Sequence, residues 1–212
     1  MIPGSSVKCM AQNGWKREEI AVGCKDSLLT LWDVNVQGEK PKWIARNLPN
    51  DELDLQIPIF DNDVHFLDAN HLVLTTGYGD IREYDVRSGQ RRPTINTSLA
   101  KGSDKQLLGK IVRSIQNEYQ VYLVNQEGHI YVLDRKKNYA VIKKLVGNRG
   151  SVRALSCFTQ GDAEYVVTGG CDRHVRVFNP NCEMQKSSEI AHAYVKQKVN
   201  SILVAPLGKY KE

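Results

Sequence analysis

Residues 169–179 read Gly-Gly-Cys-Asp-Arg-His-Val-Arg-Val-Phe-Asn, a turn of small and polar residues followed by alternating residues and a large apolar residue before Asn179. Three further segments, which end at Asp33, Asp85 and Asp134, follow the same pattern: residues 23–33, 77–85 and 125–134. The four copies end about 45–52 positions apart. A repeat of this length, built from short strands, is typical of a WD-type β-propeller.

The alternation of side chains supports this interpretation. Val175 and Val177 alternate with polar or charged neighbours, as do other residues of the third strands, which fits short antiparallel hairpins. The pattern predicts three strands in each repeat: 7–12, 19–23 and 28–34; 63–67, 72–77 and 81–86; 110–115, 120–125 and 129–134; and 152–158, 164–169 and 174–178. Outer strands are expected at 42–47, 92–96, 140–145 and 187–191, and we expect the turn glycines to adopt positive φ.

The fold class predicted is therefore all-β, with blades at about residues 5–47, 58–97, 107–146 and 150–191 and a final strand at 199–206. Four blades and one strand make a thin ring, and an open arc would expose strand edges. We therefore expect an incomplete portion of a larger ring, either a fragment or a chain whose start is missing.

Bulk properties are those of an ordinary globular protein. The chain has 212 residues, of which 41% are hydrophobic and 25% charged, and a net charge of +5 that permits an acidic or nucleic-acid partner without requiring one. The sequence contains no apolar run of about 18 residues, which a membrane-spanning helix would need, and its first residues do not resemble a secretory signal. The five cysteines include no CxxC pair, which predicts free thiols in a reducing compartment and no zinc site.

One long connection is more specific than the repeats. Residues 50–63 read NDELDLQIPIFDND, and they are followed by Arg82-Glu83-Tyr84-Asp85 and by Gln90-Arg91-Arg92-Pro93. With Gly150-Ser151-Val152-Arg153, Asp172-Arg173 and residues 194–203, these segments resemble the nucleolar WD-repeat family of large-subunit ribosome assembly factors, the Nop-seven-associated protein and WD-repeat protein seventy-four group. The resemblance covers about residues 20–205.

The resemblance implies a part of a seven-bladed propeller in the nucleus and nucleolus that associates with pre-60S particle proteins and with an AAA-type ATPase that removes it. It also implies a non-catalytic scaffold with no cofactor and no membrane partner. Scattered lysines, if they converge on one rim, add rRNA as a partner. A general WD-repeat adaptor, such as a ubiquitin-ligase substrate receptor or a chromatin reader, stays open as the alternative, because a fold alone does not decide function.

Nine residues are candidates for partner binding. Four are acidic and lie in the long connection: Asp51, Asp54, Asp61 and Asp63. They fit a docking loop, turn-capping side chains or, less well, a calcium site, since the glycine and distal glutamate of an EF-hand loop are absent. Five are arginines near strand ends, suited either to phosphate and carboxylate partners or to pairing with blade aspartates: Arg82, Arg91, Arg92, Arg153 and Arg173.

Catalytic motifs are missing from the sequence. The five histidines include no HxH or HExxH pair, and neither a phosphate-binding glycine loop nor a GxSxG nucleophile elbow occurs. We therefore expect binding without chemistry.

Overall fold

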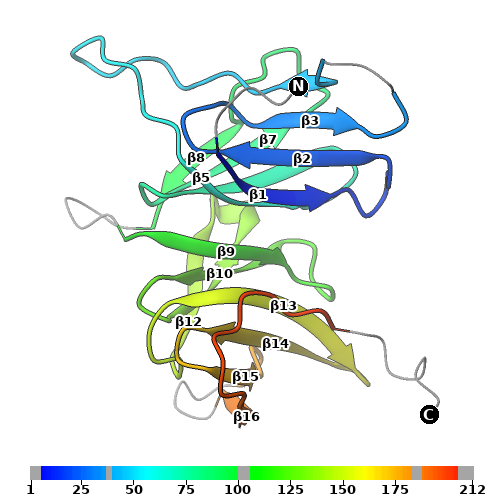
Figure 1. Cartoon of the computed structure of the whole chain (residues 1–212), viewed down its shortest axis with the longest axis vertical. Helices are drawn as coiled ribbons and strands as arrows, with labels where there is room; N and C mark the ends of the chain where they lie inside the picture. The colour runs from blue at the N-terminus through cyan, green and yellow to red at the C-terminus, as the bar shows by residue number, and fades with distance from the viewer. Residues whose placement is uncertain (1–5, 37–39, 100–105, 183–187, 205–212) are drawn as a thin grey trace. The chain divides into compact units, whose positions relative to one another are not determined.

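The computed structural model describes residues 6–36, 40–99, 106–182 and 188–204. These residues form four antiparallel sheets of four strands each, which confirms the all-β, WD-type blade architecture (Figure 1). The chain divides into two compact units, residues 1–111 with 136–140 and residues 112–135 with 141–212. The blade limits given above remain a prediction.

The first unit contains two complete sheets. The first sheet has the order β1 (Val7–Gln12), β2 (Glu19–Cys24), β3 (Thr30–Asp33) and β4 (Trp43–Ile44). The second has the order β5 (Asp61–Phe66), β6 (His71–Thr76), β7 (Asp80–Asp85) and β8 (Ile95–Ser98). The connection between β4 and β5 extends away from both sheets (Figure 1).

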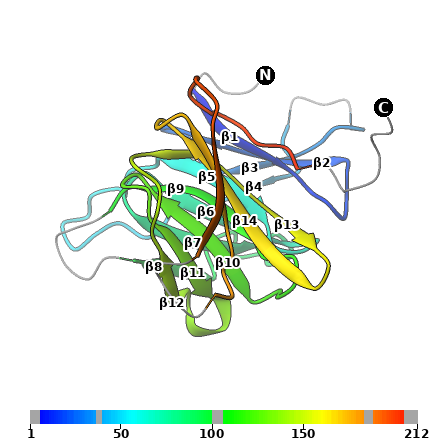
Figure 2. The ribbon, with the colours of Figure 1, turned by 90° about the horizontal axis from the view of Figure 1, so that it is seen from below.

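The third sheet consists of β9 (Leu108–Arg113), β10 (Gln120–Asn125), β11 (Ile130–Asp134) and β12 (Ala140–Leu145), with a short 3-10 helix at Arg135–Lys137. The fourth consists of β13 (Val152–Gln160), β14 (Ala163–Gly170), β15 (His174–Phe178) and β16 (Glu189–Tyr194). The long hairpin of β13 and β14 is prominent in Figure 2. Strands β1, β10, β12 and β15 have the predicted limits.

Four strand predictions need correction. The outer strands expected at 92–96 and 187–191 lie later in the chain, at Ile95–Ser98 and Glu189–Tyr194. The outer strand expected at 42–47 shrinks to Trp43–Ile44, because the amide of Arg46 leaves the sheet and donates to the carbonyl of Arg91 (2.8 Å). Residues 199–204 form no strand: the amide of Val199 donates to the carbonyl of Gly170 in β14 (3.1 Å), but within the described residues no run of paired residues follows it. Residue 187, at the start of the predicted outer strand, and residues 205–206 lie outside the described part.

Burial is greatest in the second strand of each sheet and falls toward the fourth. Strands β6 and β10 are buried at all but their first residue, whereas β16 is almost wholly exposed. Each unit has its own apolar core. The core of the first unit packs the two sheets together through residues such as Leu31, Phe66 and Leu74, and that of the second includes Tyr122, Val166 and Phe178. Successive side chains of a strand point to opposite faces of the sheet, and in the middle strands the side chains on both faces are buried. This explains why these strands are rich in Val and Leu.

The turn glycines serve two purposes, only one of which we expected. Gly79 and Gly128 have φ of 89° and 95°, as predicted. Gly77 and Gly169 do not need positive φ; an added Cβ would lie 2.4 Å from Phe60 Cδ1 and 2.6 Å from Val199 Cγ1, respectively. These two glycines therefore let the segment that packs beside each sheet approach its second strand closely.

Candidate functional site

The fourth sheet presents a candidate binding site at the end where β14 turns into β15. Three segments meet there: residues 146–151 before β13, the turn at 171–173, and residues 195–204 after β16. The amide of Cys171 donates to the carbonyl of Ser151 (3.0 Å), and the amide of Val195 donates to the carbonyl of Arg173 (2.9 Å). The amide of Val199 donates to the carbonyl of Gly170 (3.1 Å), so backbone bonds hold all three segments together.

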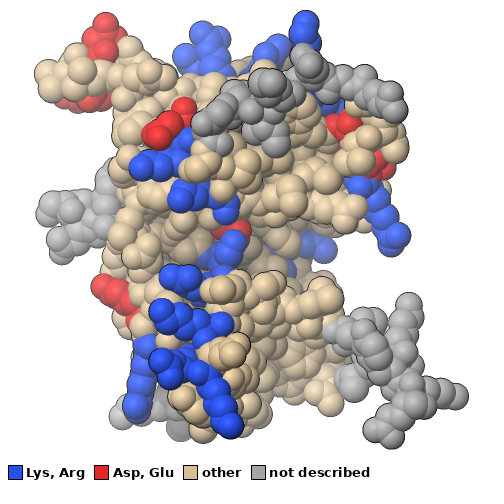
Figure 3. Space-filling view, in the orientation of Figure 1, with Lys and Arg blue, Asp and Glu red and all other residues tan. Residues whose placement is uncertain are grey.

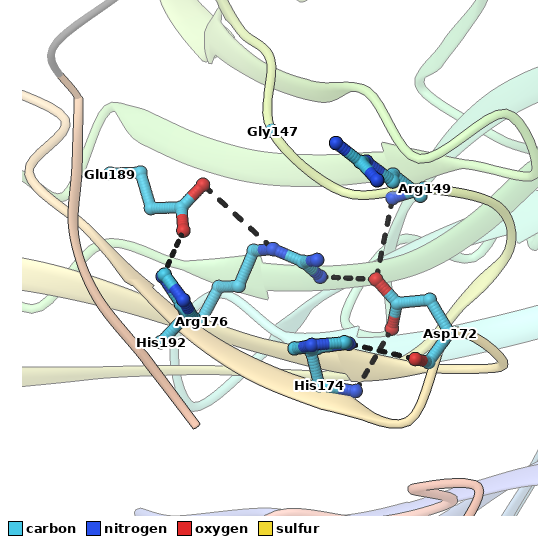
Figure 4. A pocket seen from close by; sticks show the side chains of 7 residues that line it. All are labelled: Gly147, Arg149, Asp172, His174, Arg176, Glu189 and His192. Atoms are coloured by element: carbon cyan, nitrogen blue, oxygen red, sulfur yellow. Dashed lines mark hydrogen bonds and ion pairs between the residues drawn. The ribbon is translucent and has the colours of Figure 1, made fainter. Parts of the chain in front are cut away.

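A pocket of about 520 Å³ opens among these segments (Figure 4). Arg176 of β15 lies between two carboxylates: its guanidinium contacts Asp172 and, on the other side, lies 3.8 Å from Glu189. Glu189 also pairs with His192 (3.0 Å). The pocket is lined by Gly147, Arg149, Asp172, His174, Arg176, Glu189 and His192.

Asp172 organises the turn. Burial raises the pKa of this carboxyl, but hydrogen bonds from Arg176 and from the backbone amides of His174 and Arg149 outweigh it and hold the pKa below its usual range. Asp172 is therefore ionised at neutral pH and its charge is compensated inside the turn. Consequently Asp172 repels an anion approaching from outside less than an unpaired carboxylate would.

Exposed cations surround this pocket. The side chain of Arg149 points away from Asp172 (Figure 4), and only its backbone amide bonds to that carboxylate. Figure 3 shows Lys and Arg side chains gathered in the lower left, over this end of the sheet. We call this surface the basic face; it consists of the exposed residues Arg149, Arg153, Arg173, Lys196 and Lys198. None of these five cations has an acidic partner among the described residues.

Three rings lie beside the basic face. The pairing of β15 with β16 places His174 opposite Tyr194 and Arg176 opposite His192. The ring centroids of His174 and Tyr194 are 5.2 Å apart, and those of His174 and His192 are 6.2 Å apart. Tyr194 remains 56% exposed. The arrangement can therefore offer both positive charge and stacking surface to a ligand.

The structure brings Arg153 and Arg173, two of the nine predicted residues, together on the basic face. The Arg153 guanidinium donates to Asn200 (3.4 Å). Arg173 is exposed and has a φ of 62°.

Four other predicted residues lie in the first unit, in and near the connection from β4 to β5. Asp51 accepts hydrogen bonds from the amides of Leu53 (2.9 Å) and Leu55 (2.8 Å), and Asn50 donates to Asp54 (2.8 Å). We call residues 50–55 the acidic turn. Asp51, Asp54 and Arg92 share a pocket of about 530 Å³, whereas Arg91 is exposed and gives its carbonyl to the amide of Arg46.

The remaining three predicted residues are buried in the first unit. Asp63 accepts bonds from Lys110 (2.7 Å) and from the amide of Ile111 (2.9 Å), and its burial raises its pKa. Asp61 is 1% exposed and Arg82 3% exposed. Burial raises the pKa of Asp61 to about 7, although the positive charge of Arg82 opposes the shift. These positions correspond to the structural alternatives given above, and we assign them no part in the binding surfaces.

Sequence reasoning overlooked Arg149 and the rings of His174, His192 and Tyr194. One signal was available in the turn before the third strand, where one residue has a positive φ. Repeats two and three have Gly79 and Gly128 at this position, whereas repeat four has Arg173. An arginine at a position that favours glycine indicates a side chain retained for a purpose. The rings could not be found this way, because β16 contains no comparable exception.

No three His, Cys, Asp or Glu side chains of the described residues come together as a metal site would require. Within the same residues, no helix has the length and apolar character needed to cross a membrane. The thiols of Cys9 and Cys157 are buried or partly buried, and desolvation raises the pKa of each, to about 12 for Cys157, so neither is an activated nucleophile.

Comparison with known proteins identifies relatives along nearly the whole chain. The chain is 32% identical to human WD repeat-containing protein 74 over 212 residues, which are 99% of this chain and 51% of the relative. It is 23% identical to ribosome biogenesis protein NSA1 of Meyerozyma guilliermondii and 25% identical to that of Eremothecium gossypii, over 86% and 87% of this chain. The chain thus spans about half the length of these curated relatives. No family model matches it.

Proposed function

The chain is homologous to WD repeat-containing protein 74 and to ribosome biogenesis protein NSA1, as its sequence motifs indicate, and on this premise we propose that it is a non-catalytic scaffold for assembly of the large (60S) ribosomal subunit. It acts in the nucleolus, where it binds proteins of the pre-60S particle. An AAA-type ATPase releases it from that particle.

One observation carries the proposal: the basic face exposes five cations without acidic partners among the described residues, whereas the two carboxylates at the same end of the sheet, Asp172 and Glu189, both face Arg176. Like charges gathered on one rigid surface repel one another and attract a ligand of opposite charge. Such a face suits the acidic surfaces and phosphate groups of a ribosomal particle.

The acidic turn supplies a second contact of opposite character. Leu53 and Leu55 are 79% and 59% exposed, beside the carboxylates of Asp51 and Asp54. Hydrogen bonds to Asp51 fix the turn before a partner arrives, which lowers the entropy lost on binding. The turn therefore suits a protein with an apolar pocket rimmed by Lys or Arg. Arg92, which shares a pocket with Asp51 and Asp54, and the neighbouring Arg91 suit acidic groups of the same partner.

Sedimentation of the tagged full-length protein from cell extract on a sucrose gradient tests the proposal. We expect co-sedimentation with pre-60S particles, and we expect the triple variant Arg149→Glu, Arg173→Glu, Lys196→Glu to move toward the top of the gradient. The matched control is Lys137→Glu, which reverses an exposed charge of the 3-10 helix in the first unit. Absence of the wild-type protein from the pre-60S fractions contradicts the proposal. Recovery with a ubiquitin ligase or with chromatin instead would establish the adaptor alternative.

A further inference from the structure

We propose that the basic face binds a single-stranded segment of RNA, with phosphates on Arg149, Arg173 and Lys196 and a base stacked on Tyr194. This inference rests on the proposed function, since it names the component of a ribosomal particle that this face contacts. The cations and the ring have separate roles, because the cations attract the backbone and the ring receives a base.

The charge distribution favours a phosphate backbone. Residues 145–160 and 190–204, which supply two of the three segments at this end, contain no Asp or Glu. The two carboxylates that are present, Asp172 and Glu189, are both engaged by Arg176. On the adjacent hairpin of β10 and β11, the exposed Glu127 lies 3.2 Å from His129 and is one carboxylate against the five cations of the basic face. The outward-facing charge of this surface is therefore positive, and its cations can contact successive phosphates.

The rings favour a ligand with flat faces. Tyr194 packs one part of its ring beside His174, at a centroid distance of 5.2 Å and an interplanar angle of 47°, and more than half of the residue stays exposed. His192, next to the same ring pair, has a side chain that is 64% exposed. An aromatic side chain that packs against a neighbouring ring and is otherwise exposed to solvent can stack on an unpaired base.

Two cations of the basic face have a backbone conformation that is unfavourable for residues with a side chain. Arg173 and Lys196 have φ of 62° and 63°, a conformation that side-chain-bearing residues rarely adopt. The amide of Val195 donates to the carbonyl of Arg173, so the two strained residues project from neighbouring points of the surface. Equivalent turns in repeats two and three use glycine, which shows that the fold itself does not require an arginine at residue 173.

Neither a duplex nor an acidic peptide uses all of these features. An A-form duplex keeps its bases stacked inside, so Tyr194 would have no base to receive. An acidic peptide would satisfy the cations but would leave the exposed rings without a role. A single strand alone engages both groups at once.

The test measures binding of the purified full chain to a fluorescent oligouridylate of about 12 nucleotides by anisotropy. Binding should weaken with salt, and the slope of log K against log[salt] should fall by about one for Arg173→Gly and for Lys196→Gly. Tyr194→Ala should weaken binding about tenfold, whereas Tyr194→Phe should retain most of that affinity. Lys137→Ala serves as the control for loss of a cation elsewhere.

Three results would overturn the inference. The first is no binding of the oligouridylate at about 0.15 M salt. The second is equal affinity for a duplex of the same length together with no effect of Tyr194→Ala. The third is displacement of the RNA by a polyglutamate peptide that binds more tightly, which would assign the face to an acidic protein.

The inference and the proposed function fail separately. A chain that binds single-stranded RNA through Tyr194 but never co-sediments with pre-60S particles contradicts the function alone. A chain that co-sediments but does not bind RNA contradicts the inference alone.

Discussion

Arg176 and Asp172 form an ion pair across the turn between β14 and β15, and both side chains are nearly buried, at 7% and 12% exposure. The pair fixes the turn that displays Arg173 and compensates a carboxylate beside the basic face. Its removal therefore has consequences for both stability and binding.

Arg176→Leu should lower the free energy of unfolding by about 3 kcal/mol, because it leaves the charge of Asp172 buried without its partner. Urea denaturation measures the loss. The double variant Asp172→Asn, Arg176→Leu should lose less than the single variant, since residue 172 then carries no buried charge. Equal losses in the two variants would show that the pairing itself contributes little.

Asp61 should make the first unit less stable as pH rises. Its pKa in the folded protein is about 7, above the ordinary value of 3.8, so the folded state binds the proton more tightly than the unfolded state. This contribution is present below about pH 4 and is lost as pH rises to about 7, with an upper limit of about 4 kcal/mol. Asp61→Asn cannot ionise, so its stability relative to the wild type should improve between about pH 4 and pH 7. Parallel stability curves for the two proteins would contradict the shift.

Gly77→Ala should destabilise the protein by about 1–3 kcal/mol, since the new Cβ would lie 2.4 Å from Phe60 Cδ1. Gly89→Ala is the matched control, because no atom lies within 4 Å of its added Cβ. Thermal denaturation should separate the two variants, and combining Gly77→Ala with Phe60→Ala should restore part of the loss. An equal effect of both alanine substitutions would mean that backbone freedom, rather than close packing, explains Gly77.

The strand pattern could be predicted from the sequence because β-strands have a local signature. Alternation around Val175 and Val177, with a turn on one side and Asn179 on the other, fixed β15 to the residue. The outer strand of the first sheet could not be located as well, since Trp43–Ile44 is ended by a hydrogen bond from Arg46 to the distant Arg91.

The candidate site was predictable only in part, for a related reason. Arg153 and Arg173 follow turns at the same end of one sheet, so the hairpin topology alone brings them together. Burial of Asp61 and Arg82 depends on the packing of β5 and β7 inside the first unit, which the position of a residue near a strand end does not reveal. Tyr194 could not be identified as part of the site, because its position opposite His174 depends on the register between β15 and β16.

Asp51→Ala should loosen the acidic turn without unfolding the sheets. Its carboxylate accepts the amides of Leu53 and Leu55, and all three residues are exposed. Hydrogen exchange of these two amides should accelerate, while the free energy of unfolding stays within about 0.5 kcal/mol of the wild type. Unchanged exchange would mean that the turn is held by other contacts, and its preformed character would then not explain binding.

Arg173→Gly should stabilise the protein by about 0.5–1 kcal/mol even as it removes a cation from the basic face. A left-handed φ of 62° costs a side-chain-bearing residue roughly 1–2 kcal/mol, and the greater freedom of glycine in the unfolded chain offsets about 0.5–1 kcal/mol of the relief. Arg173→Ala removes the same charge but keeps the strained backbone, so it should not be stabilised. Thermal denaturation of the three proteins distinguishes these effects. A gain in stability for glycine but not alanine, with RNA binding weakened in both, would show that the arginine is retained for its ligand at the expense of the fold. Equal stability of all three would remove the strain from that argument.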